Sequence, residues 1–231
     1  MVEFIRHNVQ RVLEEIARAS EAAGRSPSEV RLVGVSKFHP LEAMRAAEDT
    51  GLFAFGESRV QEAREKWDLW EGEKKLPWHL IGHLQRNKVR SALEMFGCVH
   101  SLDSLRLARE LQRQCSELGR NISVLLEVNL SGEEAKYGFA PSELPGAVEV
   151  LLREGTALSL DGLMTMAPFG ASEKDARRIF QDLRNLRERM NRDFSLHMKE
   201  LSMGMSDDYP WAVREGSTLV RVGTAIFGNR E

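Results

Sequence analysis

RLVGVSKFHP, residues 31–40, is the stretch of sequence that decides the fold. Five of its first six residues are apolar, small or β-branched, which predicts a strand buried on both faces. Pro40 suits the first turn of a helix, so the strand ends at Lys37 and a helix begins just beyond it. Burying an ammonium is costly unless it is paired or deprotonated, so Lys37 is a candidate for a lysine kept for its amine. The alternative is that Lys37 already lies past the strand end and is solvated.

The same strand-then-helix unit recurs along the chain. The sequence predicts strands at 31–37, 52–56, 78–84, 98–102, 122–130, 158–166, 196–203 and 219–227. It predicts helices over 40–51 and 60–70, after residue 86, over 104–118, from residue 141, and over 172–192. An amphipathic helix over 1–23 precedes them. Eight such units predict an α/β fold, a closed (β/α)₈ TIM barrel forming one domain over 1–231, with an extra N-terminal helix. An open doubly wound sheet is the alternative, but no G-x-G-x-x-G follows the first strand.

Composition narrows the classes of partner. The 231 residues include 32 Lys plus Arg and 35 Asp plus Glu, so the net charge of −3 predicts neither a nucleic-acid nor an anionic-membrane partner. Charged residues interrupt the apolar positions of the first 23 residues, unlike a signal peptide or a membrane span. Cys98 and Cys115 stand in no metal or redox spacing, so we expect a reduced, cytoplasmic compartment.

Closure of the barrel determines which strands are neighbours. The last strand pairs with the first, so residues 219–224 lie beside the strand that ends at Lys37. Strand alternation then places Arg221 and Gly223 on the inward face. A guanidinium inside a barrel needs an acceptor, which is either a carboxylate in a structural ion pair or a ligand.

The seventh predicted strand ends in the run LSMGMS, residues 201–206. Active sites of such barrels lie at the carboxyl ends of the strands, where loops after strands seven and eight commonly hold a phosphate. Ser202 offers a hydroxyl, and Gly223 and Thr224 offer backbone amides. Two ordinary tight turns are the alternative. A lysine amine beside a phosphate site favours a Schiff base with a phosphorylated aldehyde, of which pyridoxal 5′-phosphate is the common one.

Eight segments of the chain resemble the pyridoxal phosphate homeostasis protein family, small single-domain relatives of the alanine racemase N-terminal barrel. The segments are LVGVSKFHP, FGESRVQE, WHLIGHLQRNK, VHSLDS, VNLSGEEAKYG, GLMTMAP, LSMGMSDDY and STLVRVGTAIFG. They occur in the family's order from Leu32 to Gly228. The resemblance implies a protein that holds pyridoxal phosphate and supplies it to apo-enzymes, and a one-domain barrel of this kind is compatible with a monomer.

The resemblance also implies roles for single residues. Lys37 matches the lysine that forms the internal aldimine with the cofactor, and Arg221 matches the arginine that faces the pyridine nitrogen. The positions matching phosphate contacts are Ser202, Gly223 and Thr224, and Met203 is assigned to the same cofactor site.

Two further positions are assigned to the cofactor pocket. Ser58 stands where the family commonly has asparagine, and serine is shorter with one donor fewer. His83 is expected to line the pocket because the third predicted strand ends there.

The same residues bear on activity. An arginine at the pyridine nitrogen disfavours protonation there and weakens the ring as an electron sink. Racemisation also needs a second proton-transfer group, which alanine racemases supply as a tyrosine from a further domain. Here the tyrosines are Tyr137 and Tyr209, and nothing positions either as a base. We therefore expect no catalytic residues and no enzyme. A pyridoxal phosphate enzyme such as an amino-acid racemase, and a barrel that binds a phosphorylated sugar without imine chemistry, stay open as alternatives.

Other candidates are weaker. His79, His83 and His100 are candidate metal ligands, but no metalloprotease motif accompanies them, and imidazoles on strands more often donate to carbonyls. We therefore expect no metal site. Lys136, in the loop over 132–138, is either a second amine for the cofactor or a solvated loop lysine.

Overall fold

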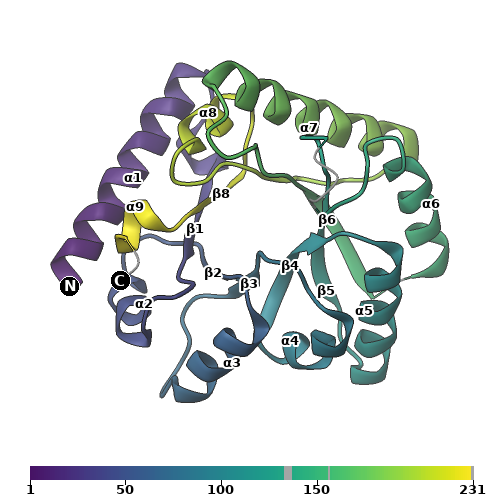
Figure 1. The fold of residues 1–231 in the computed structure, drawn as a ribbon. Helices are drawn as coiled ribbons and strands as arrows, with labels where there is room; N and C mark the ends of the chain where they lie inside the picture. The colour runs from purple at the N-terminus through teal and green to yellow at the C-terminus, as the bar shows by residue number, and fades with distance from the viewer. Residues whose placement is uncertain (133–136, 156, 230–231) are drawn as a thin grey trace.

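Eight parallel strands form a closed barrel in sequence order, as the sequence predicts (Figure 1). The structure, a computed structural model, describes residues 1–132, 137–155 and 157–229. The first and last strands pair, with Val33 opposite Arg221, so the doubly wound alternative is wrong. The strands are β1 (Arg31–Val35), β2 (Ala54–Glu57), β3 (Trp78–Leu80), β4 (Phe96–Leu102), β5 (Ile122–Glu127), β6 (Leu158–Met164), β7 (Glu200–Ser202) and β8 (Leu219–Val222).

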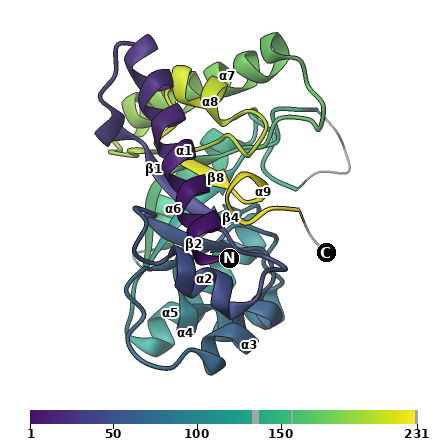
Figure 2. The ribbon, with the colours of Figure 1, turned by 90° about the vertical axis from the view of Figure 1, so that its left-hand side faces the viewer.

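Helices surround the barrel, and the predicted N-terminal helix is among them. The helices are α1 (Val2–Ala22), α2 (Leu41–Ala47), α3 (Val60–Leu69), α4 (Val89–Met95), α5 (Leu105–Leu118), α6 (Leu144–Glu154), α7 (Glu173–Phe194), α8 (Tyr209–Arg214) and α9 (Thr224–Phe227). Helix α1 lies along one side of the barrel against α2, α8 and α9 (Figure 2). The Asn8 side chain donates to the carbonyl of Ile226 at 3.0 Å, which links both ends of the described chain. No helix among the described residues is long and apolar enough to cross a membrane.

Several predicted boundaries are wrong, and the last strand is the clearest case. Residues 224–227 form α9 instead of continuing β8, because the backbone leaves the extended conformation at Gly223. The carbonyl of Gly223 then accepts hydrogen bonds from the amides of Ile226 and Phe227, which closes a helical turn. Strand β3 also ends early, at Leu80, and Gly82 lies so close to Ser58 that a Cβ on it would be 2.4 Å from the Ser58 carbonyl oxygen.

The interior of the barrel is only partly apolar. Its apolar core consists of Val33, Ala54, Cys98, Leu125, Met164 and Leu219, whereas the larger core lies between the strands and the helices. Buried polar side chains share this interior, among them His79, His100, Ser202 and Arg221. Because most such barrels fill the interior with branched apolar residues, these polar groups indicate a functional end.

Candidate functional site

The turn after β1 holds Lys37 at the carboxyl ends of the strands. Lys37 lies two residues past Val35 and is half-buried, so it is beyond the strand without being fully solvated. The amide of His39 donates to the carbonyl of Ser36 at 3.0 Å, and Phe38 takes a positive φ of 65°. Such a φ is uncommon for a bulky residue, so this turn is fixed by its surroundings. One of these is Glu62 on α3, whose carboxylate accepts from the amide of Phe38.

A buried ion pair lies directly behind this turn. Lys66 Nζ donates to the Ser36 carbonyl, to Glu57 Oε1 and to Glu62 Oε1, each at 2.8 Å. The Ser36 hydroxyl donates to the same oxygen of Glu57, also at 2.8 Å. Burial raises the pKa of Glu57, against the opposing effects of Lys66 and of the Ser36 hydrogen bond. Lys66 and Glu57 therefore connect the ends of β1 and β2 to α3.

Arg221 on β8 points into the barrel, as strand alternation predicts. Its residue is 3% exposed. Its guanidinium donates to Ser202 Oγ at 2.5 Å and to the carbonyl of Thr165 at 3.0 Å, so both acceptors are neutral. Within the described residues no carboxylate pairs with it directly, and Asp208 and Glu127 act on it only through longer-range attraction. Burial lowers the pKa of Arg221 to about 10, so the group stays charged at neutral pH.

A chain of buried polar side chains leads away from Arg221. Ser202 Oγ is 2.9 Å from His100 Nδ1, and His100 Nε2 is 3.0 Å from His79 Nδ1. Because a guanidinium has no acceptor, Ser202 must accept from Arg221. Burial is the main cause that lowers the pKa of His79 to about 4 and that of His100 well below its usual value, so both rings are neutral.

The backbone after β8 forms a small group of amides. The amides of Gly223 and Ala225 donate to Ser206 Oγ at 3.3 and 3.4 Å. Two backbone amides that converge on one hydroxyl oxygen in this way can also bind an oxygen of an anion. A Cβ at Gly223 would be 3.1 Å from the Val35 carbonyl oxygen, so glycine allows β8 to approach the end of β1. Thr224 begins α9 and is exposed.

The other predicted residues are spread around this end of the barrel. Ser58 follows β2 and is partly buried against Gly82. Met203 follows β7, is fully buried and donates its amide to the carbonyl of Leu219. His83 follows β3, with Nδ1 2.7 Å from Asp103 Oδ2 and its ring stacked on Tyr137. Lys136 lies outside the described residues.

The three histidines considered as candidate metal ligands do not come together. His83 lies outside β3 and pairs with Asp103, whereas His79 and His100 face each other inside the barrel. The third group beside them is the thiol of Cys98, which the sequence analysis did not associate with any histidine.

Sequence reasoning also missed three groups near the mouth. Ser206 ends the LSMGMS run, and nothing in that run indicates its contact with the amides of Gly223 and Ala225 after β8. Lys66 and Glu57 are nine residues apart, on α3 and β2, so no helical spacing in the sequence predicts that they pair. Glu127, the last residue of β5, is 5% exposed, and burial followed by repulsion from Asp103 raises its pKa to about 7. A charged residue ending a buried strand was the one available signal for it.

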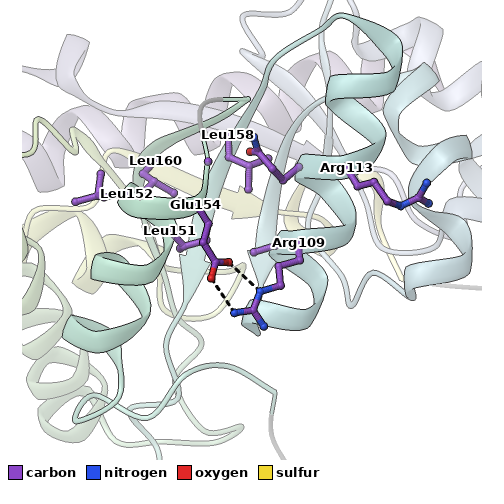
Figure 3. A pocket seen from close by; sticks show the side chains of 10 residues that line it. Arg109, Arg113, Leu151, Leu152, Glu154, Leu158 and Leu160 are labelled. Carbon is purple, nitrogen blue, oxygen red and sulfur yellow. Dashed lines mark hydrogen bonds and ion pairs between the residues drawn. The ribbon is translucent and has the colours of Figure 1, made fainter.

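A separate apolar pocket lies away from this site. It is a cavity of about 220 Å³ between α5, α6 and the start of β6, walled by Leu151, Leu158 and Leu160 (Figure 3). A bidentate ion pair between Arg109 and Glu154 crosses its edge. It contains none of the predicted site residues, so it does not compete with the barrel mouth as the candidate site.

Comparison with known proteins agrees with this geometry. The family described as alanine racemase, N-terminal domain, matches residues 5–231. A pyridoxal phosphate homeostasis protein of Aquifex aeolicus is 40% identical over 223 residues, which cover 96% of this chain and 97% of that protein. The pyridoxal phosphate homeostasis protein of Pseudomonas aeruginosa is 41% identical over 227 residues, covering 98% and 96%.

Solved structures give the same picture of the fold. PipY of Synechococcus elongatus, in a structure with pyridoxal phosphate bound, is 39% identical with a TM-score of 0.82, covering 92% of this chain and all of that one. The alanine racemase of Corynebacterium glutamicum is 19% identical with a TM-score of 0.74, covering 97% of this chain and 60% of that one. The second likeness shows the fold alone.

Proposed function

The chain belongs to the pyridoxal phosphate homeostasis protein family, and from that premise we propose that it holds pyridoxal 5′-phosphate and supplies it to apo-enzymes. In this proposal the chain acts as a one-domain cytoplasmic monomer, and the cofactor is joined to Lys37 through an imine. Relatives that carry this name, and a relative solved with pyridoxal phosphate bound, support the ligand.

The observation that carries the proposal is the buried Arg221. A fully charged guanidinium inside a barrel is costly unless something accepts from it, and here the acceptors among the described residues are a hydroxyl and a carbonyl. An aromatic ring nitrogen with a lone pair fits beside such a donor. The amides of Gly223 and Ala225 on the adjacent backbone fit a phosphate, because the oxygen they hold now belongs to a hydroxyl.

The residues of the site divide the work in the following way. Bound pyridoxal phosphate supplies an aldehyde that condenses with an amine and releases water. Lys37 provides the amine, and the fixed turn at Phe38 limits where it can reach. Arg221 holds its charge toward the ring nitrogen, and Ser202, which the resemblance assigns to the phosphate, also accepts from the guanidinium and positions it. Ser206 joins Gly223 and Thr224 at the phosphate, while Ser58, His83 and Met203 border the pocket.

This arrangement favours holding the cofactor over catalysis on it. A cation that cannot lose its proton keeps the ring nitrogen unprotonated, which weakens carbanion stabilisation. Burial raises the pKa of Tyr209, and the charges that act on it belong to residues of α1. Tyr137 stacks on His83 at the rim. No described contact places either hydroxyl as a proton donor opposite Lys37.

Ligand binding and attachment are tested first. Purified protein is loaded with pyridoxal phosphate, reduced with borohydride and digested, and the modified peptide is identified by mass spectrometry. We expect a yellow chromophore that reduction bleaches and an adduct on Lys37, absent in Lys37→Met and retained in the control Lys75→Met. An adduct on another lysine, or tight coloured binding by Lys37→Met, would refute the assignment.

Delivery is tested separately. Loaded protein and an equal concentration of free pyridoxal phosphate are compared for the rate at which they activate an apo-enzyme. Faster activation from the loaded protein supports supply. Equal or slower activation contradicts it, and measurable turnover of free amino acids would favour the racemase alternative.

A further inference from the structure

His79, Cys98 and His100 form a compact group inside the barrel, below the proposed cofactor site. His79 on β3 pairs in register with Cys98 on β4, and His100 follows two residues later on the same face of β4. One ligand atom from each lies within 4.8 Å of the others, and all three residues are buried. A thiolate is a soft ligand and imidazole suits copper and zinc, so these three groups are of the kind that binds transition metals.

We propose that His79, Cys98 and His100 bind one Cu(I) ion. The two facing ring nitrogens, His79 Nδ1 and His100 Nε2, are 3.0 Å apart. Two metal–nitrogen bonds of about 2.0 Å would span that gap at an angle of about 97°. A trigonal angle needs the nitrogens about 3.5 Å apart, so the rings would separate by roughly half an ångström.

Charge selects the ion. A neutral imidazole binds a metal through its unprotonated nitrogen, and His79 Nδ1 and His100 Nε2 already face each other. A monovalent ion with one thiolate and two neutral rings has no net charge, which suits an interior walled by Val33 and Leu125. A divalent ion in the same group would leave one uncompensated positive charge.

The surroundings provide a supporting contact and a way in. The second nitrogen of His100, Nδ1, is 2.9 Å from Ser202 Oγ, and such an outer hydrogen bond fixes the tautomer of a ligating ring. A pocket of about 260 Å³ at the amino ends of the strands has His79 and Cys98 in its wall, together with Asp161, Glu200 and Arg31, which pairs with Glu200. This pocket offers a route from the surface to the group.

Binding changes one protonation state and no oxidation state. A cysteine binds a metal as its thiolate, so the Cys98 thiol gives up its proton when the ion binds. Forming the copper–sulfur bond releases that proton to solvent, and each ring keeps one proton on its non-ligating nitrogen. One proton is therefore released for each ion bound.

The test is an anaerobic titration of the full-length protein with Cu(I), using bicinchoninate as a coloured competitor and a pH indicator for protons. We expect one ion and one proton per chain. Cys98→Ser should weaken binding by roughly 100-fold or more, because it removes the only anionic ligand. The matched control is Cys115→Ser, since that thiol lies on α5 in the outer core, and it should bind as the unchanged protein does.

A second variant, His79→Leu, keeps the test decisive if Cys98→Ser fails to fold, which circular dichroism would reveal. It should also lose the site, while its fold is checked by the same signal. Binding that survives either folded variant, a stoichiometry without proton release, or tighter binding of Zn²⁺ than of Cu(I) would overturn the proposal. None of these measurements requires pyridoxal phosphate.

Discussion

Replacing Lys66 with methionine tests whether the buried ion pair behind the Lys37 turn holds this end of the barrel together. The Lys66 side chain is 10% exposed, and Glu57, its partner, is fully buried. Lys66→Met keeps the length of the apolar stem but removes three hydrogen bonds, to Glu57, Glu62 and the Ser36 carbonyl. Glu57 is then left in an apolar setting with the Ser36 hydroxyl as its remaining donor.

Removing one partner of a buried pair costs about 3–5 kcal/mol in free energy of unfolding. That is a large share of the roughly 5–15 kcal/mol typical of a folded domain. The cost should depend on pH. Burial already raises the pKa of Glu57, and losing the attraction of Lys66 raises it further. A carboxyl whose pKa is higher when folded binds its proton more tightly in the folded state, so stability falls as pH rises through that pKa. Lys66→Met should therefore be most damaging at pH 8 and partly recover at pH 5.

Urea unfolding monitored by tryptophan fluorescence measures this, because Trp67, Trp70 and Trp78 form one aromatic cluster beside α3. The matched control is Lys75→Met, whose ion pair with Asp49 is exposed and should contribute little. The double variant Glu57→Gln with Lys66→Met should regain most of the loss by removing the buried charge. A loss no larger than that of Lys75→Met, or one independent of pH, would refute the reasoning.

Three further changes have defined outcomes. Ser206→Ala should weaken pyridoxal phosphate about tenfold in absorbance titrations, because a charge-assisted hydrogen bond beside Gly223 is lost, and should leave pyridoxal unaffected. Burial raises the pKa of Glu127 to about 7, so stability should fall by about 3 kcal/mol as pH rises from 4.5 past 7. Glu127→Gln should abolish that decline in urea titrations at pH 5 and 8. Gly162→Ala should cost about 3 kcal/mol, because its Cβ would lie 2.0 Å from a β7 carbonyl oxygen, whereas Gly146→Ala, with nothing within 4 Å, should not destabilise.

The barrel was predictable because its evidence is local and repeated. Each short apolar run followed by a helical pattern predicts one strand-then-helix unit. Eight such units predict a closed barrel even if the ends of individual strands and helices are misplaced by a few residues. The boundaries were not predictable to the same degree. Val220, Val222 and Ile226 alternate as in a strand, yet the chain turns helical at Gly223 because contacts with β1 and Ser206 decide there. The short helix α8 has too few residues to show a periodicity at all.

The residues of the site show the same difference between what local sequence predicts and what tertiary contacts determine. Arg221 follows from strand alternation alone, and the structure places it inside the barrel. The group of His79, Cys98 and His100 was missed because it needs the pairing of β3 with β4, which no spacing along the chain encodes. The spacing of His79 and His83 was misleading for a related reason, since the strand that would place both on one face ends at Leu80. The local sequence pattern thus predicts which face of a strand a side chain is on. The register between strands determines which other side chains it contacts.

The neutral acceptors of Arg221 are consistent with the proposed storage of a reactive aldehyde in this barrel. A carboxylate in contact would satisfy the guanidinium but cancel its charge, whereas Ser202 and the Thr165 carbonyl satisfy its N–H groups and leave the charge in place. His100, behind Ser202, adds no second positive charge, because burial and nearby cations keep its ring neutral. An uncancelled cation in a low-dielectric interior raises the cost of a second positive charge beside it. In the proposed complex a bound ring nitrogen would therefore stay unprotonated, and the chemistry left to the ligand would be reversible attachment at Lys37.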